Sequence, residues 1–266
     1  MKNRKSLILV KLGGSLITDK KKPFTAKLDV IKRLAKEIHR AQGKVDAKLI
    51  VGNGGGSFTH FVSEEYDLIN GLKNSTSYKG LAQLQEATVR LNQIVVQELI
   101  KAGENAFTLH PSSFIFADTK QLNKVFLEPL LKLLTLDMLP VVYGGAIFDL
   151  QKGVIDFSTE KTLNFLALQL GKYYKIERVI YCSKTDGVYD HKGKTIAMIM
   201  TKDFPKVKKL IGKTEGIDVT GGMLHKVEES IKLAKSGIPS LIINGSRKNE
   251  LLDVLLIGSH HGTLIK

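Results

Sequence analysis

The stretch Leu49-Ile50-Val51-Gly52-Asn53-Gly54-Gly55-Gly56-Ser57-Phe58-Thr59-His60 decides the fold and points to the candidate site. Its apolar opening is typical of a buried strand, and the three glycines after it tolerate backbone angles that a Cβ would forbid. A helix capped by Ser57 or Thr59 is expected next, so that loop N–H groups and the helix dipole face one point. The stretch therefore predicts an oxyanion site with His60 as a further donor. A tight turn followed by a surface histidine would also explain these residues, and three glycines alone do not decide.

Composition favours one large α/β unit, or two lobes that share a sheet. The 266 residues are 43% hydrophobic and 25% charged, which is ordinary for a globular protein. The single cysteine, Cys182, lies in an apolar run, so we expect a buried thiol, a reducing compartment and no disulfide framework. The apolar stretch 7–10 is too short for a signal peptide. These features predict a cytoplasmic protein.

The formal net charge of +14 points to anionic ligands. A nucleic-acid-binding protein would gather lysine and arginine on one face among aromatic residues, whereas the lysines here are dispersed and tryptophan is absent. We therefore expect a small anionic substrate and neither nucleic acid nor a membrane as partner. Nucleic-acid binding stays open as the alternative.

The segment from Ser6 to Ser15 repeats the pattern of a hydrophobic strand that runs into glycines. Lys11 ends this strand, and a buried lysine is costly unless an anion meets it, so Lys11 is a phosphate-binding candidate. A lysine that extends to solvent from the strand end is the simpler alternative. A helical pattern separates the two strands, and such a crossover places both glycine loops at one edge of a parallel sheet. Lys11 and His60 are therefore expected to lie close together.

The other patterns predict alternating helices and strands. Polar residues from Glu64 to Lys79 indicate a mobile loop, and a hairpin is expected at 149–153. The lysine-rich segment 192–213 is typical of a solvated flap. Helices are predicted over about 28–42, 81–102, 121–136, 158–170 and 218–236, and strands over 105–109, 139–143, 178–182, 238–243 and 262–265.

Glycine loops at strand ends, accompanied by isolated lysines and no Ser-His-Asp set, favour phosphoryl transfer. Lysines would stabilise charge on the transferring group, and loop amides would hold the donor and acceptor phosphates in line. An acceptor that is itself an oxyanion needs no general base, so a missing catalytic aspartate is no objection.

A set of ordered motifs now supports a family resemblance: Lys11-Leu12-Gly13-Gly14-Ser15, Gly54-Gly55-Gly56-Ser57-Phe58-Thr59-His60, Pro111-Ser112-Ser113-Phe114, Asp186-Gly187-Val188-Tyr189, Asp218-Val219-Thr220-Gly221-Gly222-Met223 with Lys226, and Gly262-Thr263. This set resembles the amino acid kinase family over essentially the full chain, and within it the branch that phosphorylates isopentenyl phosphate. The resemblance implies an open three-layer αβα sandwich with a mainly parallel sheet. It also implies an acceptor-binding lobe over 1–175, an ATP-binding lobe over 176–266 on the same continuous sheet, Mg-ATP as donor, and a homodimer.

The resemblance also assigns roles to residues by position. The catalytic set is Lys11, Lys20, His60 and Lys226. Acceptor contacts are expected from Gly14, Gly55, Gly56, Ser57, Leu81, Leu84, Gly144 and Gly145. ATP contacts are expected from Lys11, Gly13, Ser183, Asp186, Gly187, Gly222 and Lys226, and no dedicated protein metal site is expected.

Some positions depart from the family pattern. Glu160 and Lys161 stand where two aspartates are common, and Glu160 retains a carboxylate that can orient the lysines. Lys184 stands where an aspartate is common and reverses a charge near the nucleotide. Asn53, Thr59 and Gly145 differ from the usual residues as well. A related phosphate or phosphonate kinase, such as an antibiotic-modifying one, and a non-catalytic phosphate- or nucleic-acid-binding regulator therefore remain alternatives.

The apolar helix after the polar loop indicates which kind of acceptor to expect. An amino acid would need charged partners for its ammonium and its carboxylate, yet this helix offers Leu81 and Leu84 on its inward side. A phosphate held by His60 and a short hydrocarbon tail on the two leucines would satisfy both ends. The expected substrate is isopentenyl phosphate.

Overall fold

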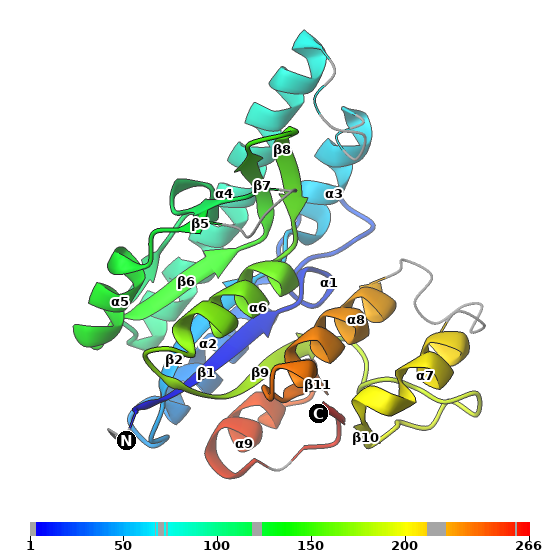
Figure 1. Cartoon of the computed structure of the whole chain (residues 1–266). Coiled ribbons are helices and arrows are strands. Elements are labelled where there is room, and N and C mark those ends of the chain that lie inside the picture. The colour runs from blue at the N-terminus through cyan, green and yellow to red at the C-terminus, as the bar shows by residue number, and fades with distance from the viewer. Residues whose placement is uncertain are drawn as a thin grey trace.

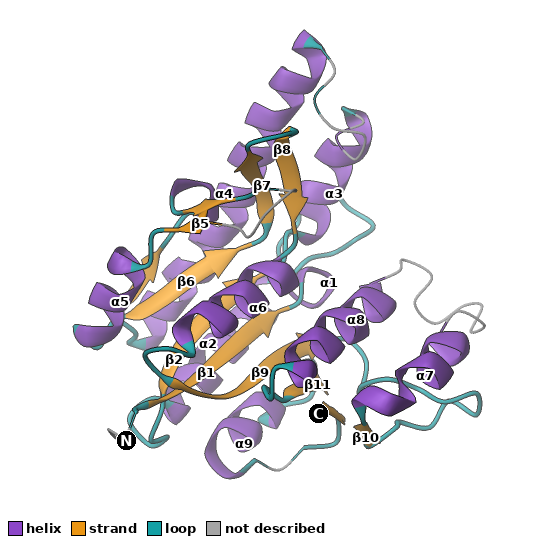
Figure 2. Ribbon diagram, in the orientation of Figure 1, coloured by secondary structure: helices purple, strands orange, loops and turns teal. Residues whose placement is uncertain are grey.

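The computed structural model describes residues 4–66, 68, 72, 74–118, 124–211, 222–258 and 260–266. Its centre is a sheet with the strand order β10-β12-β11-β9-β1-β2-β6-β3, covered by helices on both faces (Figures 1 and 2). The strands are β1 (Ser6–Leu12), β2 (Lys48–Asn53), β3 (Ala106–Thr108), β6 (Leu139–Tyr143), β9 (Lys175–Ser183), β10 (Met198–Ile199), β11 (Ser240–Asn244) and β12 (Thr263–Ile265). Two antiparallel ribbons accompany it, β4 (Ile115–Phe116) with β5 (Lys124–Val125), and β7 (Gly145–Asp149) with β8 (Gly153–Phe157).

Helices connect these strands, and those at 14–17, 204–211 and 250–257 were not predicted from the sequence. The α-helices are α1 (Gly14–Ile17), α2 (Leu28–Ala41), α3 (Gly56–Glu65), α4 (Ser75–Ala102), α5 (Glu128–Thr135), α6 (Thr159–Leu170), α7 (Phe204–Ile211), α8 (Gly222–Lys235) and α9 (Glu250–Ile257). Short 3-10 helices cover η2 (Pro111–Ser113) and η3 (Thr201–Asp203).

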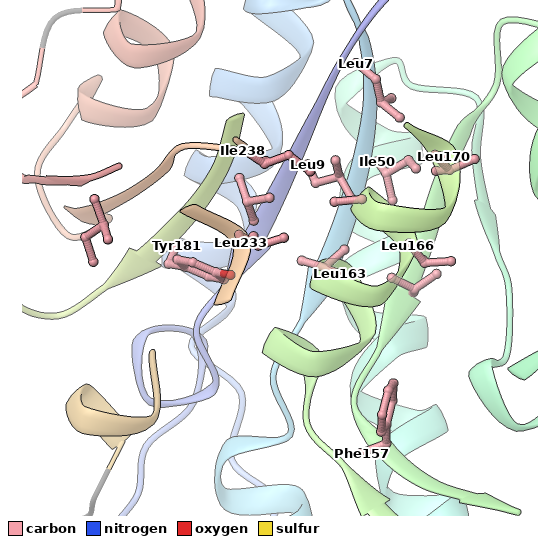
Figure 3. Packing of buried hydrophobic residues seen from close by; sticks show 14 of the residues in the cluster. Leu7, Leu9, Ile50, Phe157, Leu163, Leu166, Leu170, Tyr181, Leu233 and Ile238 are labelled. Carbon is pink, nitrogen blue, oxygen red and sulfur yellow. The ribbon is translucent and has the colours of Figure 1, made fainter. Parts of the chain in front are cut away.

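The three layers follow from alternation along buried strands. In β1, Leu7 and Leu9 face a core that α5, α6 and α8 cover, whereas Ile8 and Val10 face the core beneath α2, α4 and α9. Figure 3 shows side chains of α6 directed at the sheet in the first core. Because both faces are buried, strands of this kind are hydrophobic throughout rather than alternating with polar residues. The predicted αβα sandwich is confirmed.

The middle of the sheet places the candidate site. β1 lies between β2 and β9 and runs parallel to both, and β2 runs parallel to β6. Their carboxyl ends therefore lie at the same edge, as predicted. Antiparallel pairing occurs in this sheet between β11 and β12, so the sheet is mainly parallel.

Three predicted segments differ from the structure. The helix predicted over 121–136 begins only at Glu128, because Lys124 and Val125 form β5 and Pro129 favours a helix's first turn. The predicted loop 64–79 is shorter on both sides: α3 continues to Glu65, and α4 begins at Ser75 after a capping box with Asn74. The lysine-rich segment, predicted as a solvated flap, contains β10, η3 and α7. Val207 of α7 is buried in the core.

Several predicted boundaries are confirmed. The hairpin at 149–153 joins β7 and β8, with Gly153 at φ +75°. α4 ends at Gly103, whose φ of +110° suits glycine. Within the described ranges, every helix is too short or too polar to cross a lipid bilayer.

Leu163 tests the packing of α6 on the sheet. Its side chain is fully buried, so Leu163→Ala should lower the free energy of unfolding by about 2–5 kcal/mol. The matched control is Leu168→Ala on the same helix, where the leucine is 43% exposed and the loss should stay below about 1 kcal/mol. Urea unfolding of both variants measures the difference, and equal losses would contradict this account of the core.

Candidate functional site

A cavity of about 520 Å³ opens at the carboxyl edge of the sheet. Its polar part carries lysines, a histidine and the glycine loops, and its other part carries aliphatic side chains. The predicted site residues that line it are Lys11, Gly13, Gly14, Lys20, Gly55, Gly56, His60, Leu81, Leu84, Gly144, Gly145, Ser183, Gly222 and Lys226. Three predicted residues, Ser57, Asp186 and Gly187, are not among its lining residues.

The two glycine loops lie directly against each other. A Cβ on Gly14 would clash with the backbone of Gly56, and a Cβ on Gly54 would lie 2.6 Å from the amide nitrogen of Gly14. The Gly54 N–H donates to the Leu12 carbonyl, and the Gly13 N–H donates to the Cys182 carbonyl, each at 2.9 Å. Glycine is thus required for close backbone approach, and the Gly13 amide fastens its loop to β9.

Ser57 holds the loop that carries Lys20. Its N–H donates to Thr18 Oγ1 at 3.0 Å, and its Oγ accepts the Thr25 N–H at 3.3 Å. The expected cap by Ser57 or Thr59 is wrong, because α3 already begins at Gly56 with Gly55 as N-cap and no side-chain cap. The acceptor contact predicted for Ser57 has no support in its position, since the residue is buried and outside the cavity lining.

Lys11 and Glu160 form a buried ion pair at the base of the cavity. Lys11 comes from the end of β1, and Glu160 from the first turn of α6, whose N-cap Ser158 accepts the Lys161 N–H. Burial by itself would raise the pKa of Glu160, but the charges of Lys11 and Lys226 and the hydrogen bond from Lys11 lower it to about 2. Burial lowers the pKa of Lys11, and Glu160 opposes that effect. Glu160 is thus the counter-charge for the lysines.

Lys226 brings α8 into the same site. Its Nζ donates to the Gly222 carbonyl at 3.0 Å, and its charge acts on both Lys11 and Glu160. The structure thus gathers two lysines around one carboxylate next to the glycine loops. The predicted stretch before Gly222, residues 218–221, lies outside the described residues.

His60 is at an exposed position of α3. Its side chain is 58% exposed, and its Nε2 lies 3.4 Å from Glu64 Oε1. It lines the cavity together with Thr59 and Lys20. The imidazole can therefore meet an anion that enters the polar part.

The apolar part of the cavity is formed by α4, the ribbon β7–β8, and Leu68 and Leu72. Gly144 must remain glycine, because a Cβ there would clash with the backbone at Thr159, whereas a Cβ on Gly145 would find Thr88 at 3.6 Å. The aliphatic lining residues are Leu68, Leu72, Leu81, Leu84, Ala146, Val154 and Ile155. This part can enclose a short hydrocarbon.

Asn53 has a structural role beside the glycine loop. It is fully buried at the end of β2, where its Oδ1 accepts Asn92 Nδ2 at 2.8 Å and its carbonyl accepts the Thr159 hydroxyl at 2.8 Å. It therefore ties α4 and α6 to the sheet.

Two titratable residues of the cavity lining were not predicted from the sequence. His225 precedes Lys226 on α8, and its Nε2 lies 2.9 Å from the Ser158 hydroxyl. Asp156, near the end of β8, also lines the cavity. The position of His225 next to Lys226 could have indicated that it lines the site. No sequence pattern around Asp156 indicated that it lines the cavity.

The loop after β9 is held by contacts with the end of β11 and the residues that follow it. Asp186 pairs with Arg247 at 2.7 Å and accepts Asn244 Nδ2 at 2.9 Å, and its hydrogen bond with Arg247 lowers the pKa of the carboxyl. Gly187 takes φ +129° against Thr263. Lys184 lies near Lys27, and its pKa is lowered by burial and by the neighbouring lysine. Asp186 and Gly187 thus shape this loop.

Comparison with known proteins gives consistent results. The sequence profile of the amino acid kinase family matches residues 6–244. The chain is 31% identical to isopentenyl phosphate kinase of Methanocaldococcus jannaschii, over 97% of this chain and 98% of that protein. It is 32% identical to isopentenyl phosphate kinase of Methanothermobacter thermautotrophicus, with the same coverage. A solved isopentenyl phosphate kinase structure superposes with a TM-score of 0.81 at 28% identity, covering 97% of this chain and all of the other.

The Glu160 carboxylate predicts a specific pH dependence of stability. Because its pKa in the folded state is about 2, below the ordinary 4.5, its contribution is complete above pH 4.5 and disappears as the pH falls toward 2. The two pKa values correspond to on the order of 3 kcal/mol. The difference in unfolding free energy between wild type and Glu160→Gln should therefore be largest near pH 6 and shrink at pH 3.

Urea unfolding at several pH values measures this difference. Glu128→Gln is the control, because Glu128 is exposed at the start of α5. A difference between wild type and Glu160→Gln that does not change from pH 6 to pH 3 would contradict the assigned ion pair.

Proposed function

The chain belongs to the amino acid kinase family, and we propose that it transfers the γ-phosphoryl group of ATP to isopentenyl phosphate, giving isopentenyl diphosphate and ADP. One observation carries this proposal: a single cavity combines a lysine- and glycine-lined part with an aliphatic part. The first suits phosphates, and the second suits a short branched hydrocarbon. The names of the similar proteins agree with this substrate.

The proposed reaction depends on position and charge. An oxygen of the acceptor phosphate attacks the γ-phosphorus of ATP, and the bond to the β,γ-bridging oxygen breaks as ADP leaves with that electron pair. Lys11, Lys20 and Lys226 stabilise the charge that spreads over the transferring group. Glu160 keeps Lys11 charged and directed into the cavity, which its buried contact supports.

In this proposal, the acceptor and the donor are bound by residues from different parts of the chain. His60 and the amides of Gly14, Gly55 and Gly56 hold the acceptor phosphate. Ser183, Gly222 and the loop after β9 form the nucleotide side, with Asp186 and Gly187 acting through the shape of that loop. The lobes 1–175 and 176–266 carry these two functions, and both contribute strands to the central sheet.

Magnesium is proposed to arrive with the nucleotide. Mg²⁺ usually keeps water ligands and binds through substrate phosphates plus one or two carboxylates. Among the described residues, no group of three or more His, Cys, Asp or Glu side chains has a metal-binding arrangement. The carboxylate of Glu160 is already paired with Lys11. The cavity therefore fits an ion held mainly by phosphates, where it would neutralise their charge.

We also propose a cytoplasmic homodimer, as the family resemblance implies. Exposed apolar side chains near the β3 edge of the sheet support a subunit contact there: Ile100 on α4, Phe107 on β3 and Leu136 after α5. The buried, unpaired thiol of Cys182 suits a reducing compartment. Light scattering of the purified protein tests the oligomeric state.

The proposed activity is tested by ATP turnover with a panel of acceptors. Isopentenyl phosphate should be phosphorylated with the highest kcat/KM. Dimethylallyl phosphate and other short alkyl phosphates should be slower substrates, since size differences of one methylene are worth only about 1–3 kcal/mol. Turnover of an amino acid or a phosphonate without turnover of isopentenyl phosphate would refute the assignment.

His60→Ala should weaken the use of the acceptor and leave ATP binding nearly unchanged. A lost charge-assisted hydrogen bond is worth about 1.5–3 kcal/mol, so kcat/KM for isopentenyl phosphate should fall roughly ten- to a hundredfold. ATP binding, measured by calorimetry, should remain close to wild type. His191→Ala, outside the cavity lining, is the control. Equal weakening of ATP and acceptor would point to a structural role for His60.

Leu84→Ala should widen substrate choice toward longer tails. Leu84 lies between the core and the cavity, so its removal enlarges the apolar part and should raise the ratio of geranyl phosphate to isopentenyl phosphate turnover. Leu91→Ala on the same helix is the matched control, because Leu91 is buried but outside the cavity lining. It should lose comparable stability while its chain-length preference stays the same. Parallel shifts in both variants would contradict the assigned tail pocket.

A further inference from the structure

The loop that carries Lys20 is a narrow hairpin beside the cavity. Thr18 and Ala26 form an antiparallel bridge at its base, and the Asp19 N–H donates to the Thr25 carbonyl at 2.9 Å. The Lys22 N–H donates to the Asp19 carbonyl at 3.2 Å and closes a turn around Lys20. The position of Lys20 therefore depends on what holds this hairpin against the rest of the molecule.

Hydrogen bonds of one α3 residue, Ser57, hold one side of the hairpin. All three polar groups of Ser57 take part: its N–H and Oγ bond to Thr18 and Thr25, and its carbonyl accepts the Phe24 N–H at 3.4 Å. These bonds fix the base and the return strand.

A stack of three side chains also holds the hairpin at Phe24, just after the turn. The Phe24 ring meets the Phe58 ring edge-on, with 5.9 Å between centroids and 83° between planes. The guanidinium carbon of Arg90 lies 4.6 Å from the centroid of Phe24 and 5.5 Å from that of Phe58, within cation–π range. Arg90 is on α4, so the stack joins the Lys20 hairpin to α3 and α4.

Phe24 is only partly buried in this position. Its ring is 43% exposed, and its φ of +48° is a left-handed value that costs energy for a residue with a Cβ. Such a conformation persists only where surrounding contacts impose it. The Phe24 ring meets Phe58 and Arg90, and the Phe24 N–H bonds to the Ser57 carbonyl.

We propose that Arg90 is a positioning residue for Lys20, acting through the rings of Phe24 and Phe58. This inference rests on the proposed kinase function for its catalytic consequence, but its structural part does not. α4 also supplies Leu81 and Leu84 to the apolar part of the cavity. The same helix thus holds the acceptor's tail and, through Arg90, the lysine that meets the phosphates.

Hydrogen exchange tests the structural part without any substrate. Exchange of the amides of Phe24 and Thr25, which bond to Ser57, should become at least about threefold faster in Arg90→Ala and in Phe24→Leu. Glu86→Gln is the matched control, because it removes the partner 3.6 Å from Arg90 Nε while leaving the ring stack in place. Unchanged exchange in Arg90→Ala would overturn the proposal, whatever reaction the protein catalyses.

Kinetics test whether the effect reaches Lys20. Arg90→Ala should lower kcat/KM about three- to tenfold, in keeping with the loss of a partly exposed cation–π contact. In a Lys20→Ala background the same substitution should cause no further loss, because the lysine that Arg90 positions is already missing. Glu86→Gln should retain wild-type turnover.

The outcomes separate the two proposals. Equal losses from Arg90→Ala in the wild-type and Lys20→Ala backgrounds would show a general structural effect and overturn the positioning role. Absence of isopentenyl phosphate turnover in wild type would refute the proposed function alone, since hydrogen exchange still decides whether Arg90 holds the hairpin.

Discussion

The buried pair of Lys11 and Glu160 is the constraint around which the site is built. A lysine at the end of a central strand loses its water, and the charge is tolerable only if a counter-charge is buried with it. α6 supplies that carboxylate in its first turn, which lies close to β6 because Gly144 carries no side chain. The pair therefore fixes how α6 sits on the sheet as well as where the lysine points.

The pair also explains why the site suits a highly charged ligand. Glu160 balances one positive charge, yet Lys226 acts on the same carboxylate and lowers the pKa of Lys11. Lys20 lines the same cavity from the hairpin above. Phosphate groups would restore the balance beside this buried pair. The net charge of +14 attracts such anions before they bind.

Much of this could be predicted from the sequence because the signals are local. Lys11, the glycine loops and their common sheet edge follow from strand patterns and the handedness of crossovers. The role of Ser57 could not be predicted, since its partners lie some thirty to forty positions earlier in the chain. The late start of α5 could not be predicted, because Lys124 and Val125 pair with β4 and this contact overrides helix propensity. Contacts between distant segments decide these details.

The same division between local and distant contacts bears on how substrate choice could change within this fold. The glycine loops of the polar part are confined by backbone, because side chains on Gly14 or Gly54 would clash with neighbouring main-chain atoms. The apolar part is bounded by side chains, and even Gly145 has room for a Cβ there. Substitutions can therefore reshape the tail pocket without disturbing the phosphates. A fold that fixes its glycine loops by backbone contacts and bounds the apolar part with side chains can keep its chemistry while its acceptor varies.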